Sequence, residues 1–419
     1  MSKYCPYILA LFFFFTALGQ KNQDKMSENG LLFLTKTYHN QSNWDAIISQ
    51  ENNINSLDTK NPELLFNLGK AFYFTSNYEK AVRYLQKSNA IRFDENTAIL
   101  LYYSLYDQGY IQEANWLKTK MNVNSIALIE KDFPAKTIES VTLESGIKLL
   151  NEKNLGNNLY YGMGLVDANI SKIVKLNAAY SHINQELETI KYAQNEVFVS
   201  FPTTFKNGFI VNPSAHAVFT TSNYTGPIII QPPFPFPPVI PFTTSTKTNL
   251  LYLQMGLSKR FQNLTIKPSF GVHFSNVNET LTDNTTIKTT SKTYQYGGAL
   301  FYNLAINKSC KLVLNPNYYY LYQSDKKGQS INFNLFCYLK KWQFLTSYLS
   351  KGNLLFAGNE GLYYYNLLQD IKSRYGFSAG RTIFKNTLVL LTYQKEFQKN
   401  QFNISNTYDS IFLTLTFKL

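Results

Sequence analysis

Serine and histidine side chains occur together at two places in the sequence where they could act as a nucleophile and its base. His216 follows Ser214 by two residues, and His273 lies between Ser269 and Ser275, so in an extended chain each histidine shares a face with its serines. A hydrolase that acts on lipid needs such a pair at a lipid-exposed surface, and no GxSxG motif accompanies either histidine. We therefore expect both histidines to line an interior without a catalytic role.

The remaining residues that could carry chemistry are few and scattered. His39 and His182 have no paired partner, and no cluster of His, Asp and Glu has the spacing of a metal site. The cysteines are Cys5, Cys310 and Cys337, too few for a disulfide framework, and we interpret the last two as unrelated thiols. The sequence therefore predicts neither a metal nor a cofactor.

Four basic residues share the inward-facing parity of the strands predicted below. They are Lys175, Lys267, Arg374 and Lys418. Unpaired, they would give a pore a mild preference for anions, because a lining of one charge sign attracts the opposite ions. The alternative is that each pairs with an interior carboxylate, which the sequence alone does not place.

The elements that must position these residues are strands, and the clearest is the segment 410–419, SIFLTLTFKL. Its apolar residues Ile411, Leu413, Leu415 and Phe417 occupy the odd-numbered positions, which share one face of a strand. Thr414 lies on the opposite, more polar face. The segment resembles the C-terminal insertion signal of bacterial outer-membrane β-barrels, although it ends in Leu rather than Phe. Similar segments precede it at 159–170, 173–183, 196–205, 209–219, 248–261, 264–276, 293–306, 312–323, 331–341, 344–356, 373–384 and 387–397, with a weaker one at 137–150.

The connections between these segments alternate in length. Tight ones, such as 262–263 and 385–386, alternate with long ones at 184–195, 220–247, 277–292, 357–372 and 398–409. Outer-membrane barrels have short periplasmic turns and long outer loops, so we predict an antiparallel transmembrane β-barrel over 137–419, with about 12–14 strands. The alternative, a large soluble β-sandwich or propeller, gives no reason for two classes of connection.

Composition agrees with a lipid-facing surface. Charged residues make up 16% of the chain and aromatic residues another 16%, including 31 Tyr and 32 Phe. Soluble proteins average roughly 25% charged residues. The net charge is +13, but the lysines and arginines are scattered singly, so we expect no nucleic-acid partner.

Two segments stand apart from the strands. Residues 1–19 have Lys3 before an apolar run and Ala17-Leu18-Gly19 after it, which predicts a cleaved secretory signal peptide. The segment 227–241, PIIIQPPFPFPPVIP, predicts a stiff extended loop that packs against the barrel's own rim or against a partner.

Residues 27–130 have a helical pattern with an internal period. Tyr38 and Trp44 precede Phe72 and Tyr78 by 34 residues (72 − 38 and 78 − 44). The segment 61–91 resembles a tetratricopeptide repeat, with Leu65, Leu68, Gly69, Phe72, Tyr78, Ala81 and Leu85 at its core positions. The fold class is therefore α + β and multidomain, a short all-α solenoid followed by the barrel.

The whole arrangement is similar to that of the YaiO family of outer-membrane proteins, and also to a shortened form of the porins that export exopolysaccharides. The resemblance implies an outer-membrane barrel with its repeats in the periplasm, bound to outer-membrane lipid, to a periplasmic protein and to an exopolysaccharide. In the repeat groove it implies Tyr38, Tyr73 and Asn77 as peptide contacts or as packing residues. We expect a channel or export component for a polar polymer or solute, and the alternative is a barrel enzyme acting on lipid or glycan.

Overall fold

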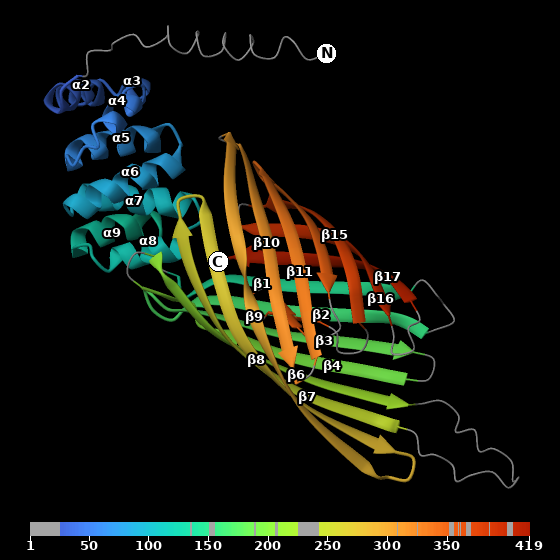
Figure 1. Cartoon of the computed structure of the whole chain (residues 1–419). Coiled ribbons are helices and arrows are strands. Elements are labelled where there is room, and N and C mark those ends of the chain that lie inside the picture. The colour runs from blue at the N-terminus through green and yellow to red at the C-terminus, as the bar shows by residue number, and fades with distance from the viewer. Residues whose placement is uncertain are drawn as a thin grey trace, which may run out of the picture. The chain divides into compact units, whose positions relative to one another are not determined.

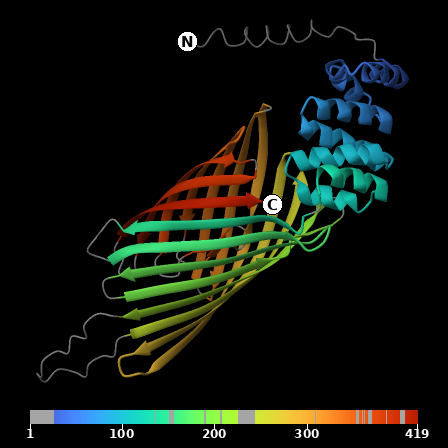
Figure 2. The ribbon, with the colours of Figure 1, turned by 180° about the vertical axis from the view of Figure 1, so that it is seen from behind.

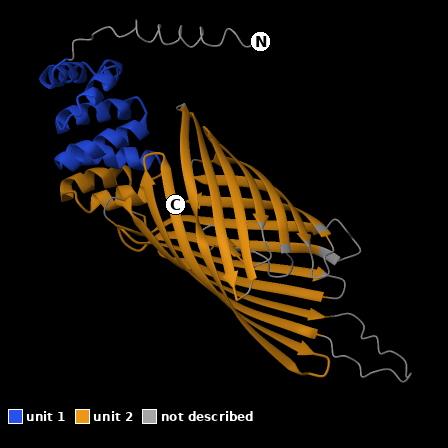
Figure 3. Ribbon diagram, viewed as in Figure 1, with its two compact units in different colours: residues 1–108 blue, residues 109–419 orange. Residues whose placement is uncertain are grey.

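A computed structural model describes residues 26–134, 136–150, 156–187, 190–205, 208–224, 243–307, 309–324, 326–351, 356–358, 360, 362–365, 370–384, 386–399 and 405–419. The predicted signal peptide (1–19) and the proline-rich loop (227–241) lie outside these residues. The chain divides into two compact units, residues 1–108 and 109–419 (Figure 3).

Helices are the regular secondary structure of the described residues 26–134. They are α2 (Glu28–Asn40), α3 (Trp44–Ile48), α4 (Glu51–Ser56), α5 (Pro62–Phe74), α6 (Tyr78–Ile91), α7 (Glu95–Asp107), α8 (Ile111–Lys118) and α9 (Val123–Asp132). Among the residues that the structure describes, no helix is long and apolar enough to cross a membrane.

The sequence dictates where these helices begin and how they pack. Asn61 caps α5, accepting hydrogen bonds from the backbone N–H groups of its first turn, and Asn77 caps α6 in the same way. Helices α2 and α5 begin 34 residues apart (62 − 28), as do α3 and α6 (78 − 44), which is the predicted period. At the contact of α5 with α6, a Cβ on Gly69 would lie 2.7 Å from Cγ of Leu85, so only glycine allows this approach.

Helices α8 and α9 belong to the second unit. The guanidinium of Arg260 on β7 (Thr243–Phe261) binds the carboxylate of Glu113 on α8 with two hydrogen bonds, Nε to Oε1 at 3.0 Å and Nη2 to Oε2 at 2.6 Å. Paired hydrogen bonds of this kind are strong and directional. They tie α8 to the sheet within the unit.

The main sheet of the second unit is closed and antiparallel (Figures 1 and 2). Its strands follow sequence order, β1 pairs with β17, and β4 pairs with β6 across the short strand β5 (Thr203–Thr204). The barrel strands are β1 (Ile138–Leu150), β2 (Gly156–Asn169), β3 (Lys175–Leu187), β4 (Ile190–Ser200), β6 (Ile210–Tyr224), β7 (Thr243–Phe261), β8 (Leu264–Leu281), β9 (Thr286–Asn307), β10 (Cys310–Gln323), β11 (Lys326–Leu339), β12 (Trp342–Lys351), β15 (Asp370–Ile383), β16 (Thr387–Lys399) and β17 (Ser405–Lys418).

The predicted fold class is therefore confirmed, a helical region followed by a closed antiparallel barrel of 14 strands. The weak first segment forms β1, which is necessary for closure because its register runs from Ser140 opposite Lys418 to Leu150 opposite Tyr408. An even strand count brings the first and last strands together in antiparallel order.

Two ends of the barrel differ in their connections. We call the end with residues 262–263, 308–309, 340–341 and 384–386 the tight-turn end, and the opposite end the long-connection end. Two of the predicted long connections are wrong: β3 and β4 extend into 184–195, and β8 and β9 into 277–292. At the ends of β8 and β9 the reason is that Thr, Asn, Lys and Glu occur on both faces, so the alternation that signals a strand is lost there.

Side chains of the barrel sort into an apolar outer face and a polar lumen. Along β7, Leu251, Leu253 and Met255 are exposed outward, whereas Tyr252 and Gln254 between them are buried inside. The inward position predicted for His273 on β8 is confirmed, since His273 is buried inside and Phe270 is exposed outside. Strand β10 alternates in the same way, with Asn315 buried inside and Tyr318 exposed outside. Outward apolar side chains with inward polar ones are the arrangement expected where lipid surrounds a barrel.

Candidate functional site: the plugged lumen

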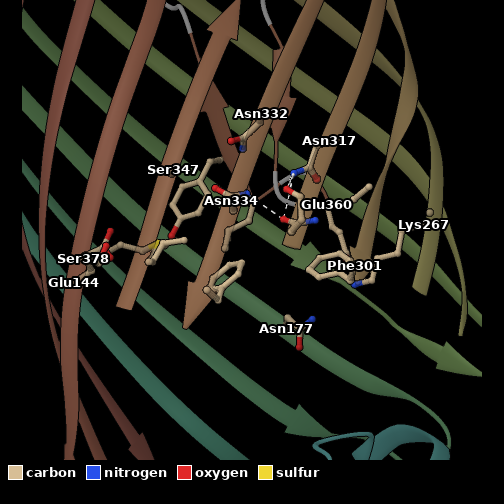
Figure 4. Close-up of a pocket in the computed structure, with 18 of the residues that line it drawn as sticks. Glu144, Asn177, Lys267, Phe301, Asn317, Asn332, Asn334, Ser347, Glu360 and Ser378 are labelled. Carbon is tan, nitrogen blue, oxygen red and sulfur yellow. Dashed lines mark hydrogen bonds and ion pairs between the residues drawn. The ribbon is translucent and has the colours of Figure 1, made fainter. Parts of the chain in front are cut away.

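The lumen contains a cavity of about 1110 Å³. Its walls come from strands all around the barrel, and Figure 4 shows some of the side chains that line it. The lining carries seven carboxyl and six basic side chains: Glu113, Glu139, Glu144, Asp167, Glu196, Glu360, Glu396, Lys148, Lys175, Arg260, Lys267, Lys311 and Arg374. The charges nearly cancel, although the whole chain has an excess of positive charge.

A second, two-stranded sheet occupies the lumen beside this cavity. It consists of β13 (Phe356–Gly358) and β14 (Tyr363–Tyr365), which lie between β12 and β15, and we call it the plug hairpin. Phe356 packs with Tyr319, Leu321, Leu349 and Ile371 in one buried cluster. The predicted strand to residue 356 and the predicted outer loop at 357–372 are therefore wrong, because β12 ends at Lys351 and β13 and β14 lie inside the barrel.

Ala357, the next residue of the plug hairpin, is also buried against the barrel wall. Ala357 is buried against Val218, Leu250 and Tyr252, and 1% of its surface is exposed. Its backbone is clamped by one side chain, because Nε2 of Gln295 donates to the carbonyl of Ala357 at 2.7 Å and Oε1 accepts from its N–H at 3.1 Å. The clamp satisfies a backbone group that would otherwise be buried without a partner.

Glu360, between the two plug strands, anchors the hairpin to the barrel wall. Its carboxylate forms an ion pair with Lys267 and accepts a hydrogen bond from Nδ2 of Asn212 at 2.8 Å, while its backbone carbonyl accepts one from Oγ of Ser214 at 3.2 Å. Lys267 lies near the turn at 262–263, whereas β12 ends at the long-connection end. The connection therefore runs down the lumen toward the tight-turn end.

The ion pair sets the charge state of Glu360. Burial raises the pKa of this carboxyl, but the charge of Lys267 and the hydrogen bonds from Lys267 and Asn212 outweigh burial and hold the pKa below its ordinary value of 4.5. Glu360 is therefore ionised at neutral pH and protonates only in acid.

The predicted basic lining residues differ in their surroundings. Lys175 pairs with Glu139 at 2.5 Å, and Lys267 pairs with Glu360, so these two match the paired alternative. Arg374 lines the cavity from β15, where it lies directly opposite Glu396 on β16. Lys418 keeps its inward parity but is exposed at the end of β17.

Both lumen histidines are buried in the wall rather than facing the cavity. Nε2 of His216 lies 3.0 Å from Oε2 of Glu196, and Nε2 of His273 lies 3.1 Å from Oε1 of Gln295, the residue that clamps the plug hairpin. Each has 1% of its surface exposed. Within the described ranges, no three His, Cys, Asp or Glu side chains come together as a metal site would require.

The three predicted groove residues of the helical region have local packing contacts. Oδ1 of Asn77 accepts a hydrogen bond from the N–H of Lys80 at 3.3 Å as a helix cap. The ring of Tyr73 lies 5.6 Å from that of Tyr78, and the carbonyl of Tyr38 accepts from the N–H of Asn43 at 2.9 Å. Their role in binding a peptide stays a prediction.

Taken together, the closed sheet, the apolar outer face and the polar, plugged lumen define a transmembrane type of β-barrel. No protein-family model matches the chain, and no curated protein matches it.

Several solved structures have a similar fold at low identity. CdiB from Acinetobacter baumannii matches with a TM-score of 0.42 and 9% identity over 67% of this chain, and this chain spans 60% of that protein. The Ralstonia pickettii toluene transporter TbuX matches with a TM-score of 0.44 and 8% identity over 68% of this chain, and the match covers 90% of that protein. The A. baumannii outer membrane protein Omp33 matches with a TM-score of 0.34 and 9% identity over 68% of this chain, and the match covers 99% of that protein. We draw no functional conclusion from similarity at this level.

Proposed function

We propose that the protein is an outer-membrane channel for polar solutes whose lumen is closed by the plug hairpin. The apolar outer face supports a place in a bilayer, and the polar cavity supports passage of hydrophilic solutes. The observation that carries the proposal is the way in which the plug is held. Its anchors are side-chain bonds from Gln295, Asn212 and Lys267, so it can leave without breaking a barrel strand pair.

The helical region completes the proposal. We propose that it lies in the periplasm and binds a protein partner through its aromatic surface, where Trp44 and Phe74 stack with centroids 4.7 Å apart and Phe74 is 50% exposed. Such a partner would displace the plug hairpin, or would deliver an exported polymer such as an exopolysaccharide to the barrel. Polymer export requires the plug hairpin to be displaced for as long as the polymer occupies the lumen.

An enzyme that acts on lipid or glycan is the alternative class. The burial of His216 and His273 in the lumen wall speaks against action on lipid, since lipid contacts the opposite face of those strands. A channel with a movable plug, unlike such an enzyme, accounts for both the polar cavity and the side-chain bonds that hold the plug hairpin.

The membrane location has a direct test. We expect the full chain, expressed in a Gram-negative host, to be recovered with the outer membrane and to migrate faster on a denaturing gel before heating than after it. The reason is that a closed barrel has no unpaired strand edge at which detergent could begin unfolding. Recovery of the unheated protein in the soluble fraction would contradict the proposal.

The Glu360 anchor gives a second test. In planar bilayers at neutral pH, Glu360→Gln should raise the mean conductance about three- to tenfold, because Gln keeps the shape and the Asn212 bond but loses the charge that pairs with Lys267. Wild-type conductance should also rise as the pH falls below about 4.5: the pKa of Glu360 is lowered in the plugged state, so the pair stabilises that state above 4.5 and is lost as the carboxyl protonates.

The matched control is Glu186→Gln, which removes a carboxylate that pairs with Lys191 at 3.1 Å on the exposed surface. It should leave conductance and its pH dependence unchanged. If Glu360→Gln conducts as the wild type does and keeps the same acid response, Glu360 is not an anchor of the plug.

A further inference from the structure

Four asparagines face the cavity from two adjacent strands. Asn315 on β10 lies directly opposite Asn334 on β11, and Asn317 lies opposite Asn332. All four line the cavity, and Figure 4 shows Asn317, Asn332 and Asn334 on this wall. We call this set the amide cluster.

The amide cluster is held in place by one of its members. Asn315 is 4% exposed, donates from Nδ2 to the carbonyl of Leu300 at 2.9 Å, and accepts at Oδ1 from Nδ2 of Asn317 at 3.2 Å and of Asn334 at 3.0 Å. Within the described part of the chain, the side-chain amide of Asn332 makes no hydrogen bond. The cluster thus presents the side-chain amide of Asn332, a donor and an acceptor together, to the cavity.

An aromatic pair continues the same face of β11 toward the tight-turn end. The rings of Phe336 and Tyr338 are nearly parallel, at 10°, with centroids 6.4 Å apart, and both line the cavity. Flat aromatic side chains present an apolar face that packs against a ligand, while a few amides fix its orientation. Sugar rings offer both complements, an apolar C–H face and a rim of hydroxyl groups.

The charges of the lumen select for an uncharged ligand. Seven carboxyl and six basic side chains line the cavity, and Lys148, Lys175 and Lys267 each pair with a carboxylate. A charged solute would have to compete with these pairs, whereas a neutral one can bond to the amides. The cavity, at about 1110 Å³, slightly exceeds the roughly 300–1,000 Å³ of small-molecule sites.

We infer that the amide cluster and the pair of Phe336 and Tyr338 form a binding site for an uncharged, polyhydroxylated solute of a few sugar units. The inference rests on the proposed channel function, which brings the solute into the lumen. Asn332, Asn317 and Asn334 supply hydrogen bonds to its hydroxyl groups, and Phe336 and Tyr338 pack against its ring faces.

The test is calorimetric titration of the full chain in detergent with neutral trisaccharides (maltotriose, cellotriose and raffinose) and with charged ones (trigalacturonate and the chitosan trimer). At least one neutral trisaccharide should bind, and more tightly than either charged one. The double variant Asn332→Ala with Asn334→Ala should weaken binding at least about tenfold, since it removes two hydrogen-bonding amides. Phe336→Ala should weaken it too.

The control is Asn276→Ala, because Asn276 is an exposed asparagine on the outer face of β8. It should bind as the wild type does, and heat-modifiable migration of every variant checks that the barrel has formed. Absence of binding by all three neutral trisaccharides, equal binding of charged ones, or unchanged binding by the double variant overturns the inference. A channel that conducts but binds no sugar refutes this inference alone, whereas sugar binding without conductance in either the wild type or Glu360→Gln refutes the channel.

Discussion

On the proposed function, Ala357→Arg should greatly increase the fraction of barrels in which the plug hairpin is displaced and the lumen is open. Ala357 is packed among Val218, Leu250 and Tyr252, and a long charged side chain there costs about 3 kcal/mol or more through overpacking and burial of charge. At 1.4 kcal/mol per tenfold, the population with the plug displaced should rise by roughly a hundredfold. Single-channel recording in planar bilayers, with entry of neutral sugars into liposomes, measures the change.

Ala357→Ser is the matched control for this variant. Serine is small enough for the site and leaves the backbone bonds to Gln295 in place, so conductance should stay near the wild-type level. If Ala357→Arg forms a heat-modifiable barrel that remains closed, another part of the chain closes the lumen.

Ala81→Arg should unfold the helical region and leave the barrel assembled. Ala81 is fully buried where α6 meets α5, with Leu85 beside it against Gly69. Overpacking together with desolvation of the charge should cost several kcal/mol, roughly half or more of the stability of a small domain. Limited proteolysis of the outer-membrane protein should therefore digest the helices while the barrel keeps its heat-modifiable migration.

Ala90→Arg provides the control, since Ala90 lies exposed on the same helix. It should resist protease as the wild type does. Mass spectrometry of the protected fragment also locates the boundary: a start near residue 109 follows the compact units, whereas a start near 137 follows the sequence-based division. If the barrel fails to assemble in Ala81→Arg, the two regions do not fold independently.

The barrel could be predicted because each strand has one apolar face turned outward and one polar face turned to the lumen, so alternation of apolar and polar residues marks each strand directly. Every predicted segment corresponds to a barrel strand, including the weak one that became β1. The positions at which several strands end were predicted incorrectly. Beyond the apolar band, both faces of β8 and β9 are polar, and a polar strand such as TIKTTSK has the composition of a loop.

The site was less predictable for a different reason. The sequence located the lumen side of Lys175 and Lys267, but the partner of Lys267 is Glu360, which comes from the segment interpreted as an outer loop. A signal was present, because FAG at 356–358 and YYY at 363–365 are unusually apolar for a connection in water. Sequence spacing alone, however, does not tell whether such a segment packs on a rim, on a partner or inside a barrel.

The pairing of β1 with β17 has a consequence for the time order of folding. Neighbouring strands such as β7 and β8 are joined by a turn of two residues. Ser140, in contrast, pairs with Lys418, which lies 278 residues further along the chain (418 − 140). Contacts this distant form slowest, because loop closure costs more conformational entropy as the intervening chain lengthens. The N-terminal helices contact one another over much shorter separations, such as the 33 residues between Tyr84 and Glu51, and should be complete while β1 and β17 still have unpaired edges. That unclosed sheet is the most aggregation-prone species along the pathway, and pairing of these two strands ends the exposure.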